Sequence, residues 1–158
     1  MTHSELVQHA AKWLRSRDYV VFTEFSTEVG EIPDAIGFKG ERSCVIECKA
    51  TVLDFKSDAR KYFRQNPISG MGQRRYFMTP KGLLSRLDVP AWWGLLEVGA
   101  DVRVTKVSRG VVEWNSLAER SFLTSMLRRA EIRVEAGNLA PSLDRWLKYD
   151  NRPPRKRR

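Results

Sequence analysis

Residues 34–50 predict a β-hairpin, and this hairpin narrows the topologies open to the chain. Two apolar runs, at about residues 34–38 and 43–50, flank the polar tetrapeptide 39–42, which contains a glycine suited to a tight turn. If the turn is centred between residues 40 and 41, Asp34 lies directly opposite Glu47. Directly opposed residues share a face of the sheet, so these two carboxylates are predicted to be neighbours. A shift of one residue in the turn would separate them.

Helix and strand patterns alternate around this hairpin. Two helix starts have the spacing of a capping box, Thr2-x-x-Glu5 and Ser116-x-x-Glu119. The predicted helices span about residues 3–17, 54–65 and 116–137. The further predicted strands span residues 19–25, 75–79, 94–98 and 102–107, with an edge strand at 111–114. The order αβββαβ, followed by extra β elements and a C-terminal helix, predicts an α/β (α+β) domain with a mixed central β-sheet flanked by helices.

Composition agrees with one globular domain. The chain has 158 residues, 42% hydrophobic and 30% charged, which excludes a wholly disordered or fibrous protein. We expect a single domain over residues 1–137 and an extension over 138–158. No apolar run approaches the roughly 18 residues of a membrane span. The first five residues lack the basic and apolar regions of a secretory signal, so a cytoplasmic protein with no membrane partner is expected.

The net charge of +9 comes largely from the C-terminal tail. Residues 151–158 carry five positive charges and no negative one. Such a tail is typical of proteins that bind polyanions, most often nucleic acid, and the alternative is a solubilising tail without a partner. The candidate nucleic-acid contacts here are Arg155, Lys156, Arg157 and Arg158.

The two cysteines, Cys44 and Cys48, are predicted to be reduced. On one strand they would lie about 13 Å apart, beyond the roughly 7 Å that a disulfide can bridge. Two further ligands would be needed for a zinc site, and neither His3 nor His9 has a convincing spacing. Buried free thiols are therefore expected.

The predicted face of Asp34, Glu47 and Lys49 suggests catalysis. Lys49 lies two residues after Glu47 and points to the same side, whereas Cys44, Ile46, Cys48 and Ala50 form the opposite, apolar or small face. Two carboxylates across a strand pair suit Mg²⁺, which keeps several waters. A cation there would stabilise the charge of a phosphodiester transition state, and Lys49 could hold a water or an oxyanion. The alternative is an ordinary exposed hairpin face.

Pro33-Asp34, followed after thirteen residues by Glu47-Cys48-Lys49, resembles the P-D…(D/E)-x-K signature of the PD-(D/E)XK phosphodiesterase superfamily. The chain is similar to its MmcB-like DNA-repair branch at residues 47–51, 54–55, 58, 75–77 and 93–96, although the loop at about 64–73 is longer than in that branch. The resemblance implies a restriction-endonuclease-like core and Mg²⁺ (or Mn²⁺) as cofactor. It implies metal ligands at Asp34, Glu47 and the backbone carbonyl of Cys48, with Lys49 as the catalytic lysine. Glu5 is a further candidate metal ligand, and a helix cap with Thr2 is its alternative.

Basic residues after the hairpin are candidate phosphate contacts. In a continuous helix Lys56, Arg60 and Arg64 recur every four residues on one face, with Lys61 beside them, and Arg74 and Arg75 follow in the chain. Such a surface would bring a nucleic-acid backbone to the acidic site. An ordinary solvated helix face is the alternative.

These observations predict a metal-dependent nuclease that hydrolyses DNA phosphodiester bonds in repair, recombination or defence, with double-stranded or branched DNA as partner. A resolvase-like enzyme of this kind would be a homodimer. The alternative is a non-catalytic nucleic-acid-binding domain with the same fold and tail. A third interpretation is an adaptor or inhibitor that captures another protein through residues 143–147.

Overall fold

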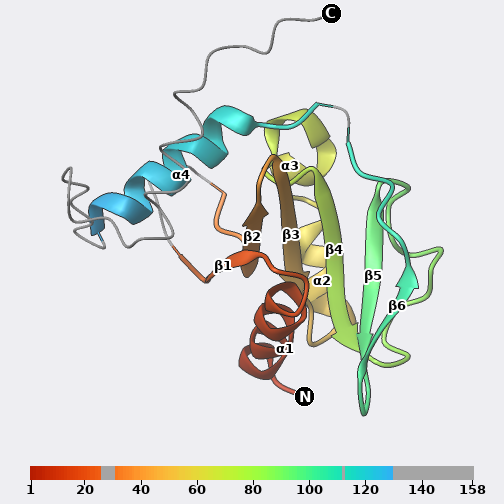
Figure 1. The fold of residues 1–158 in the computed structure, drawn as a ribbon. Helices are drawn as coiled ribbons and strands as arrows, with labels where there is room; N and C mark the ends of the chain where they lie inside the picture. The colour runs from red at the N-terminus through yellow and green to blue at the C-terminus, as the bar shows by residue number, and fades with distance from the viewer. Residues whose placement is uncertain (26–30, 112, 130–158) are drawn as a thin grey trace, which may run out of the picture. The chain divides into compact units, whose positions relative to one another are not determined.

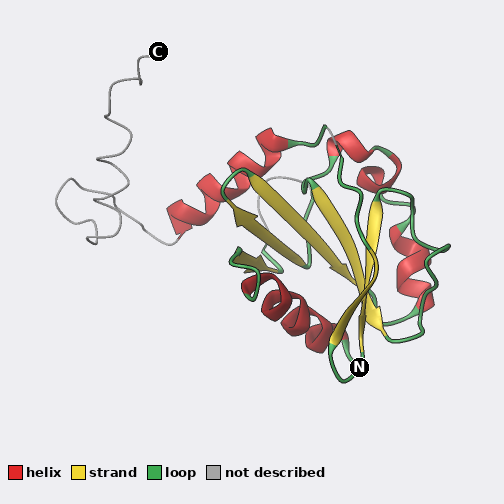
Figure 2. Ribbon diagram, turned by 45° about the vertical axis from the view of Figure 1, so that its right-hand side comes forward, coloured by secondary structure: helices red, strands yellow, loops and turns green. Residues whose placement is uncertain are grey.

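The computed structural model describes residues 1–25, 31–111 and 113–129, and its centre is a six-stranded mixed β-sheet (Figures 1 and 2). The strands follow one another across the sheet in chain order. β3, β4 and β5 are parallel neighbours, and the other neighbouring pairs are antiparallel. The strands are β1 (Val20–Thr23), β2 (Ala35–Lys39), β3 (Arg42–Cys48), β4 (Arg74–Pro80), β5 (Trp93–Val98) and β6 (Val102–Lys106). The predicted α+β class with a mixed sheet flanked by helices is confirmed.

The hairpin has the predicted register. Ala35 pairs with Ile46 and Lys39 pairs with Arg42, so continuing the pairing by one residue sets Asp34 opposite Glu47. The turn is tight because Gly40 adopts a left-handed conformation, with φ of 55°, that costs glycine little.

Helix α1 (His3–Arg15) covers one face of the sheet. Its capping box is present: the Thr2 hydroxyl accepts the Glu5 N–H, and the Glu5 carboxylate accepts the Thr2 N–H. The apolar stripe of Leu6, Ala10 and Leu14 is buried against the sheet. The sheet residues in this core include Cys44, Ile46, Cys48, Tyr76 and Met78.

The opposite face of the sheet is covered by the segment between β3 and β4, as Figure 2 shows. This segment contains α2 (Val52–Asp58), α3 (Tyr62–Gln65) and the short 3₁₀ helix η1 (Pro67–Ser69). Phe55 packs edge-on against Phe77, and Phe77 stacks on Trp93, which is fully buried. Helices therefore cover both faces, and the parallel strands are buried as parallel strands usually are.

The prediction of one helix over residues 54–65 is wrong. The helix ends at Asp58, Lys61 adopts an extended backbone (φ −65°, ψ 140°), and α3 restarts at Tyr62. The break lets Asp58 and Arg64 both turn inward, which a straight helix would not allow with Lys56, Arg60 and Arg64 on one outer face.

The start of the last described helix, α4 (Ser116–Arg129), also differs from the prediction. Asn115 caps it by accepting the Ala118 N–H, while Glu119 binds the Gly72 N–H and the Trp114 indole instead of forming a capping box. Val111, Glu113 and Trp114 are not in a strand, so the predicted edge strand is not formed by the described residues. The predicted end of the helix, the extension and the basic tail lie outside the described residues.

Residues Met1–Ser125 form one compact unit, and the second unit, Met126–Arg158, is described only as far as Arg129. None of the described helices combines the length and the apolar composition that a membrane span requires.

Gly94 in β5 offers a test of the sheet packing. An added Cβ would overlap the Tyr76 ring and lie 2.7 Å from the Lys106 carbonyl oxygen. We expect Gly94→Ala to lower the free energy of unfolding by about 1–3 kcal/mol, the usual cost of overpacking. Denaturant titration measures this, with Gly99→Ala as the matched control because its Cβ would meet Lys81 at an ordinary 3.6 Å. Equal stabilities of the two variants would contradict the packing of β4, β5 and β6.

Candidate active site

Asp34 lies just before β2, where the hairpin ladder ends. Pro33 has no N–H to give to the ladder, and the Asp34 carboxylate accepts the Cys48 N–H at 2.7 Å. Its other oxygen lies 3.5 Å from Nε2 of His3, and 18% of the Asp34 side chain is exposed. Asp34 is thus anchored to β3 while one carboxylate oxygen stays near solvent.

The backbone carbonyl of Cys48 lies on the same side of β3 as Asp34. The Cys48 N–H points toward β2, whereas the next N–H, that of Lys49, donates to the Met78 carbonyl in β4 at 2.9 Å. In a strand the N–H and C=O of one residue point the same way, so the Cys48 carbonyl also points toward β2. The predicted oxygen donor is therefore directed to the Asp34 side.

Glu47 and Lys49 lie on the face of the sheet opposite to the one that α1 covers, and both are buried. Nζ of Lys49 lies 3.3 Å from Oε2 of Glu47, and Nη2 of Arg64 lies 2.9 Å from Oε1. Glu47 is 1% exposed, so burial raises its pKa, and the Arg64 guanidinium opposes that shift. Burial alone would lower the pKa of Lys49, but Glu47 and Asp58 outweigh it and raise the pKa above the usual value. Lys49 is therefore protonated at neutral pH.

Glu47 and Lys49 belong to a larger buried charge cluster, defined here as Glu31, Glu47, Lys49, Asp58 and Arg64. Asp58 accepts hydrogen bonds from Lys49 at 3.1 Å and from Nε of Arg64. Glu31 accepts the Met71 N–H at 2.6 Å and lies 3.5 Å from Nη1 of Arg64. The five residues are held together by mutual ion pairs, and each is at most 8% exposed.

The sequence pattern did not predict the cluster roles of Glu31, Asp58 and Arg64. For Asp58 a signal exists, because it follows Phe55 by three residues and so shares the buried face of α2. Arg64 stacks over Trp93, with its guanidinium carbon 4.7 Å from the ring centre. Glu31 comes from the loop before β2, and no local pattern marks it.

The oxygen donors at the end of the hairpin fit a magnesium-like cation in their chemistry. Asp34 supplies a carboxylate and Cys48 a carbonyl, and Mg²⁺ commonly takes only one or two protein carboxylates with waters in the remaining positions. Among the described residues, no three His, Cys, Asp or Glu side chains are grouped to hold a metal by themselves. Both oxygens of Glu47 are paired with cations, so a metal bound by Glu47 would compete with Lys49 and Arg64 for this carboxylate.

Glu5, the other candidate ligand, is occupied by its capping role. Its carboxylate accepts the Thr2 N–H at 2.6 Å, and this hydrogen bond lowers the pKa of Glu5. In the structure Glu5 therefore acts as a helix cap, which was the alternative to a metal ligand.

The predicted phosphate contacts divide into buried and exposed residues. Arg64 is buried in the charge cluster, and Arg75 is 1% exposed, donating to the carbonyls of Met71, Gly72, Pro67 and Gly70. Neither guanidinium is available to a nucleic-acid backbone, so these two predictions are wrong in this structure. Lys61 pairs with Asp58 at 2.9 Å but is half exposed.

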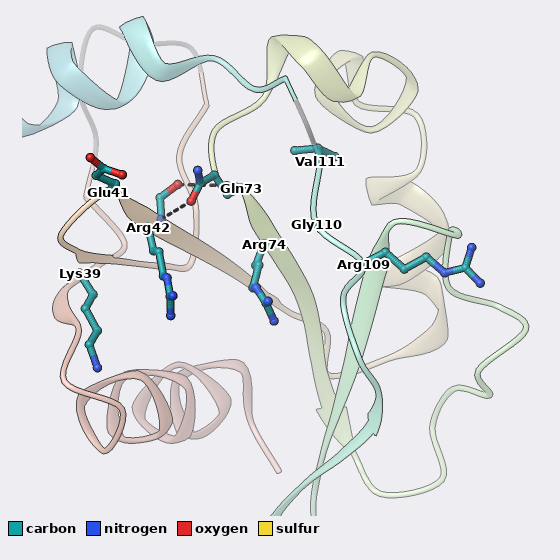
Figure 3. A pocket seen from close by; sticks show the side chains of 9 residues that line it. Lys39, Glu41, Arg42, Gln73, Arg74, Arg109, Gly110 and Val111 are labelled. Carbon is teal, nitrogen blue, oxygen red and sulfur yellow. Dashed lines mark hydrogen bonds between the residues drawn. The ribbon is translucent and has the colours of Figure 1, made fainter.

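The remaining predicted contacts are exposed or undescribed. Lys56, Arg60 and Arg74 are exposed, and Arg74 lines a hollow at the far end of β3 and β4 (Figure 3). The tail residues Arg155, Lys156, Arg157 and Arg158 lie outside the described residues.

The two cysteines agree with their prediction. Both are free and buried, and burial raises the pKa of the Cys44 thiol to about 12. Burial also raises the pKa of the Cys48 thiol, so both thiols are protonated and unreactive at neutral pH.

Comparison with known proteins supports the fold alone. No family model and no curated protein matches the chain. A solved structure, the SPO1766 protein of unknown function from Silicibacter pomeroyi, is similar with a TM-score of 0.63 and 20% sequence identity. The similarity covers 99% of this chain and 99% of that one. At this identity the match indicates a shared architecture.

Proposed function

We propose that this protein is a metal-dependent phosphodiesterase that hydrolyses DNA, with a restriction-endonuclease-like core of the PD-(D/E)XK type. The observation that carries the proposal is the hairpin register, which sets Asp34 opposite Glu47 with Lys49 3.3 Å from the Glu47 carboxylate. The order of α1, the hairpin, a helical crossover and the parallel strand β4 supports the same reading. The cofactor would be Mg²⁺ or Mn²⁺.

Each residue of the site would have its own role in the proposed hydrolysis. Asp34, the Cys48 carbonyl and Glu47 would hold the cation, which would share the Glu47 carboxylate with Lys49 and Arg64. The cation would supply Lewis acidity to the scissile phosphate. Lys49, protonated because its pKa is raised, would stabilise the charge that develops on the phosphate oxygens and would not act as a base.

A second function, a non-catalytic nucleic-acid-binding domain, is favoured by one observation. Glu47 is 1% exposed, and cations from Arg64 and Lys49 neutralise it from within the chain. A carboxylate neutralised in this way has no need of a metal. In this alternative the charge cluster is a structural element, and only surface cations contact the nucleic acid.

Cleavage assays separate the two functions. Purified full-length protein is incubated with end-labelled duplex, single-stranded and four-way-junction DNA in Mg²⁺, in Mn²⁺ or in EDTA. The nuclease proposal predicts cutting in either metal and none in EDTA. Binding of DNA without cutting of any substrate in either metal would refute it and support the binding domain. The preferred substrate would define the class of DNA on which the enzyme acts.

A further inference from the structure

We propose that Arg42, Arg74 and Arg109 form a binding site for the phosphate backbone of nucleic acid, separate from the candidate active site. The three arginines come from different segments: Arg42 begins β3, Arg74 begins β4, and Arg109 follows β6. With Lys39 they line a hollow of about 610 Å³ at the turn end of the hairpin (Figure 3). The site therefore depends on the tertiary fold and has no contiguous sequence motif.

The base of the hollow is held together by hydrogen bonds between these segments. Gln73 donates its N–H to the Ser43 hydroxyl at 3.0 Å, and its side-chain oxygen accepts the Ser43 N–H at 3.3 Å. The Gln73 carbonyl accepts the Val111 N–H at 2.9 Å. The arginines are consequently carried on a connected backbone, which limits the ordering cost when an anion binds.

The charge around the hollow is unbalanced. Glu41 is the acidic residue of the lining, and it points away from Arg42 and Arg74 in Figure 3. Lys39 is paired with Asp18 at 3.1 Å, so its charge is partly neutralised. The hollow thus depends on its three arginines for unpaired positive charge.

These arginines differ from the two buried ones. Arg64 is paired with carboxylates inside the protein, and Arg75 donates from Nε and Nη2 to loop carbonyls. In the described part of the chain, the exposed guanidinium groups of Arg42, Arg74 and Arg109 make no hydrogen bond or ion pair. A guanidinium offers a planar fork of donors that matches a phosphate, so exposed, unpaired arginines around one hollow suit a phosphate ligand.

The arrangement favours an extended polyanion over a single small anion. Lys39, Arg42 and Arg74 extend side by side, and Arg109 projects away from them (Figure 3). The charges are therefore spread along the surface and do not converge on one point. Successive phosphates of a nucleic-acid strand can meet such a row one after another.

This surface is independent of the proposed catalysis. Arg42 and Glu47 are five residues apart on β3, a distance of about 17 Å along the strand. The odd separation also points their side chains to opposite faces of the sheet. The surface can therefore bind nucleic acid whether or not the protein cuts it.

The test is a binding measurement with cleavage switched off. Fluorescence anisotropy with a short labelled duplex, in EDTA and over a range of salt concentrations, compares full-length wild type with the triple variant Arg42→Gln/Arg74→Gln/Arg109→Gln. The control, Lys81→Gln/Arg86→Gln/Arg103→Gln, removes the same charge from the β5–β6 end of the sheet. Far-ultraviolet circular dichroism and thermal unfolding check that both variants are folded, which is expected because the substituted side chains are exposed at their positions.

We expect the arginine variant to bind at least about tenfold more weakly and to lower the salt slope by about 2–3, because each lost phosphate contact reduces that slope by about 0.9. The control should change affinity less than about threefold. Equal losses in the two variants would overturn the proposal, since they would show an effect of net charge alone. Unchanged duplex binding, with calorimetric binding of inorganic phosphate lost in the arginine variant, would also overturn it in favour of a small-anion site. Cutting by wild type with no effect of the arginines would refute this site and leave the nuclease proposal standing.

Discussion

Asp34→Asn is expected to abolish metal-dependent DNA cleavage while leaving the protein folded. The substitution removes the negative charge that would hold the cation, and the rate should fall by about 10³-fold or more, equivalent to about 4 kcal/mol of transition-state stabilisation. The fold should survive because an asparagine oxygen can still accept the Cys48 N–H, which Asp34 now accepts at 2.7 Å. The contact with His3 at 3.5 Å is half exposed and worth at most about 1 kcal/mol.

The measurement is the initial cleavage rate at saturating Mg²⁺, beside the thermal midpoint of each protein. Asp101→Asn is the matched control, because it makes the same chemical change at an exposed turn between β5 and β6. The control should cut DNA at the wild-type rate. An Asp34→Asn protein that is folded and cuts within about threefold of wild type would remove Asp34 from the active site.

The largest effect on stability is expected for Asp58→Asn. The Asp58 carboxylate is 2% exposed and lies within ion-pair distance of Lys49, Lys61 and Arg64. Its removal takes an ion-pair and hydrogen-bond partner away from Lys49 and from Arg64, which both stay buried. Breaking a buried ion pair in this way costs about 3–5 kcal/mol, a large fraction of the about 5–15 kcal/mol that a domain has.

Denaturant titration at neutral pH measures this loss. Asp54→Asn is the control, since Asp54 is exposed on the same helix and its loss should cost at most about 1 kcal/mol. A stability of Asp58→Asn within about 1 kcal/mol of wild type would show that the charge cluster does not depend on this carboxylate.

The pH dependence of the stabilities of wild type and Asp58→Asn gives an independent check. Burial alone would raise the pKa of Asp58, but Arg64 and the neighbouring lysines outweigh it and lower the pKa from 3.8 to about 2. A carboxylate with a lowered pKa contributes stability above its ordinary pKa and loses it as pH falls through the folded value. The advantage of wild type over Asp58→Asn should therefore be constant near neutral pH and shrink between about pH 4 and pH 2. A difference that stays constant to acid pH would contradict the ion pairs of Asp58.

The hairpin and its register could be predicted from local sequence because both depend on short-range chemistry. Gly40 defines a tight turn, and the apolar set of Cys44, Ile46 and Cys48 is buried against α1 only in the register that also sets Asp34 opposite Glu47. The capping box of Thr2 and Glu5 was predicted for the same reason, because its two residues are only three positions apart in the chain.

Whether each basic residue is buried or exposed could not be predicted in the same way. The spacing of Lys56, Arg60 and Arg64 assumes one straight helix, but the break after Asp58 turns Arg64 into the protein. The reason is tertiary, because Arg64 forms ion pairs with Glu31, Glu47 and Asp58. Glu31 and Glu47 lie in other segments of the chain, as does Trp93, on which Arg64 packs. A buried cation with several partners outweighs the small preference for helix continuation.

The sequence by itself determined the register of the hairpin, the free state of the two cysteines and the mixed α+β class, since periodicity and turn chemistry act over a few residues. Only the tertiary structure decided which charges are available for function. It placed Glu47 and Lys49 in a buried cluster closed by Arg64 and used Arg75 to bind loop carbonyls. Among the described residues, it left Arg42, Arg74 and Arg109 unpaired around one hollow. Burial and pairing of a charge depend on groups brought together from distant segments, and no local pattern records them.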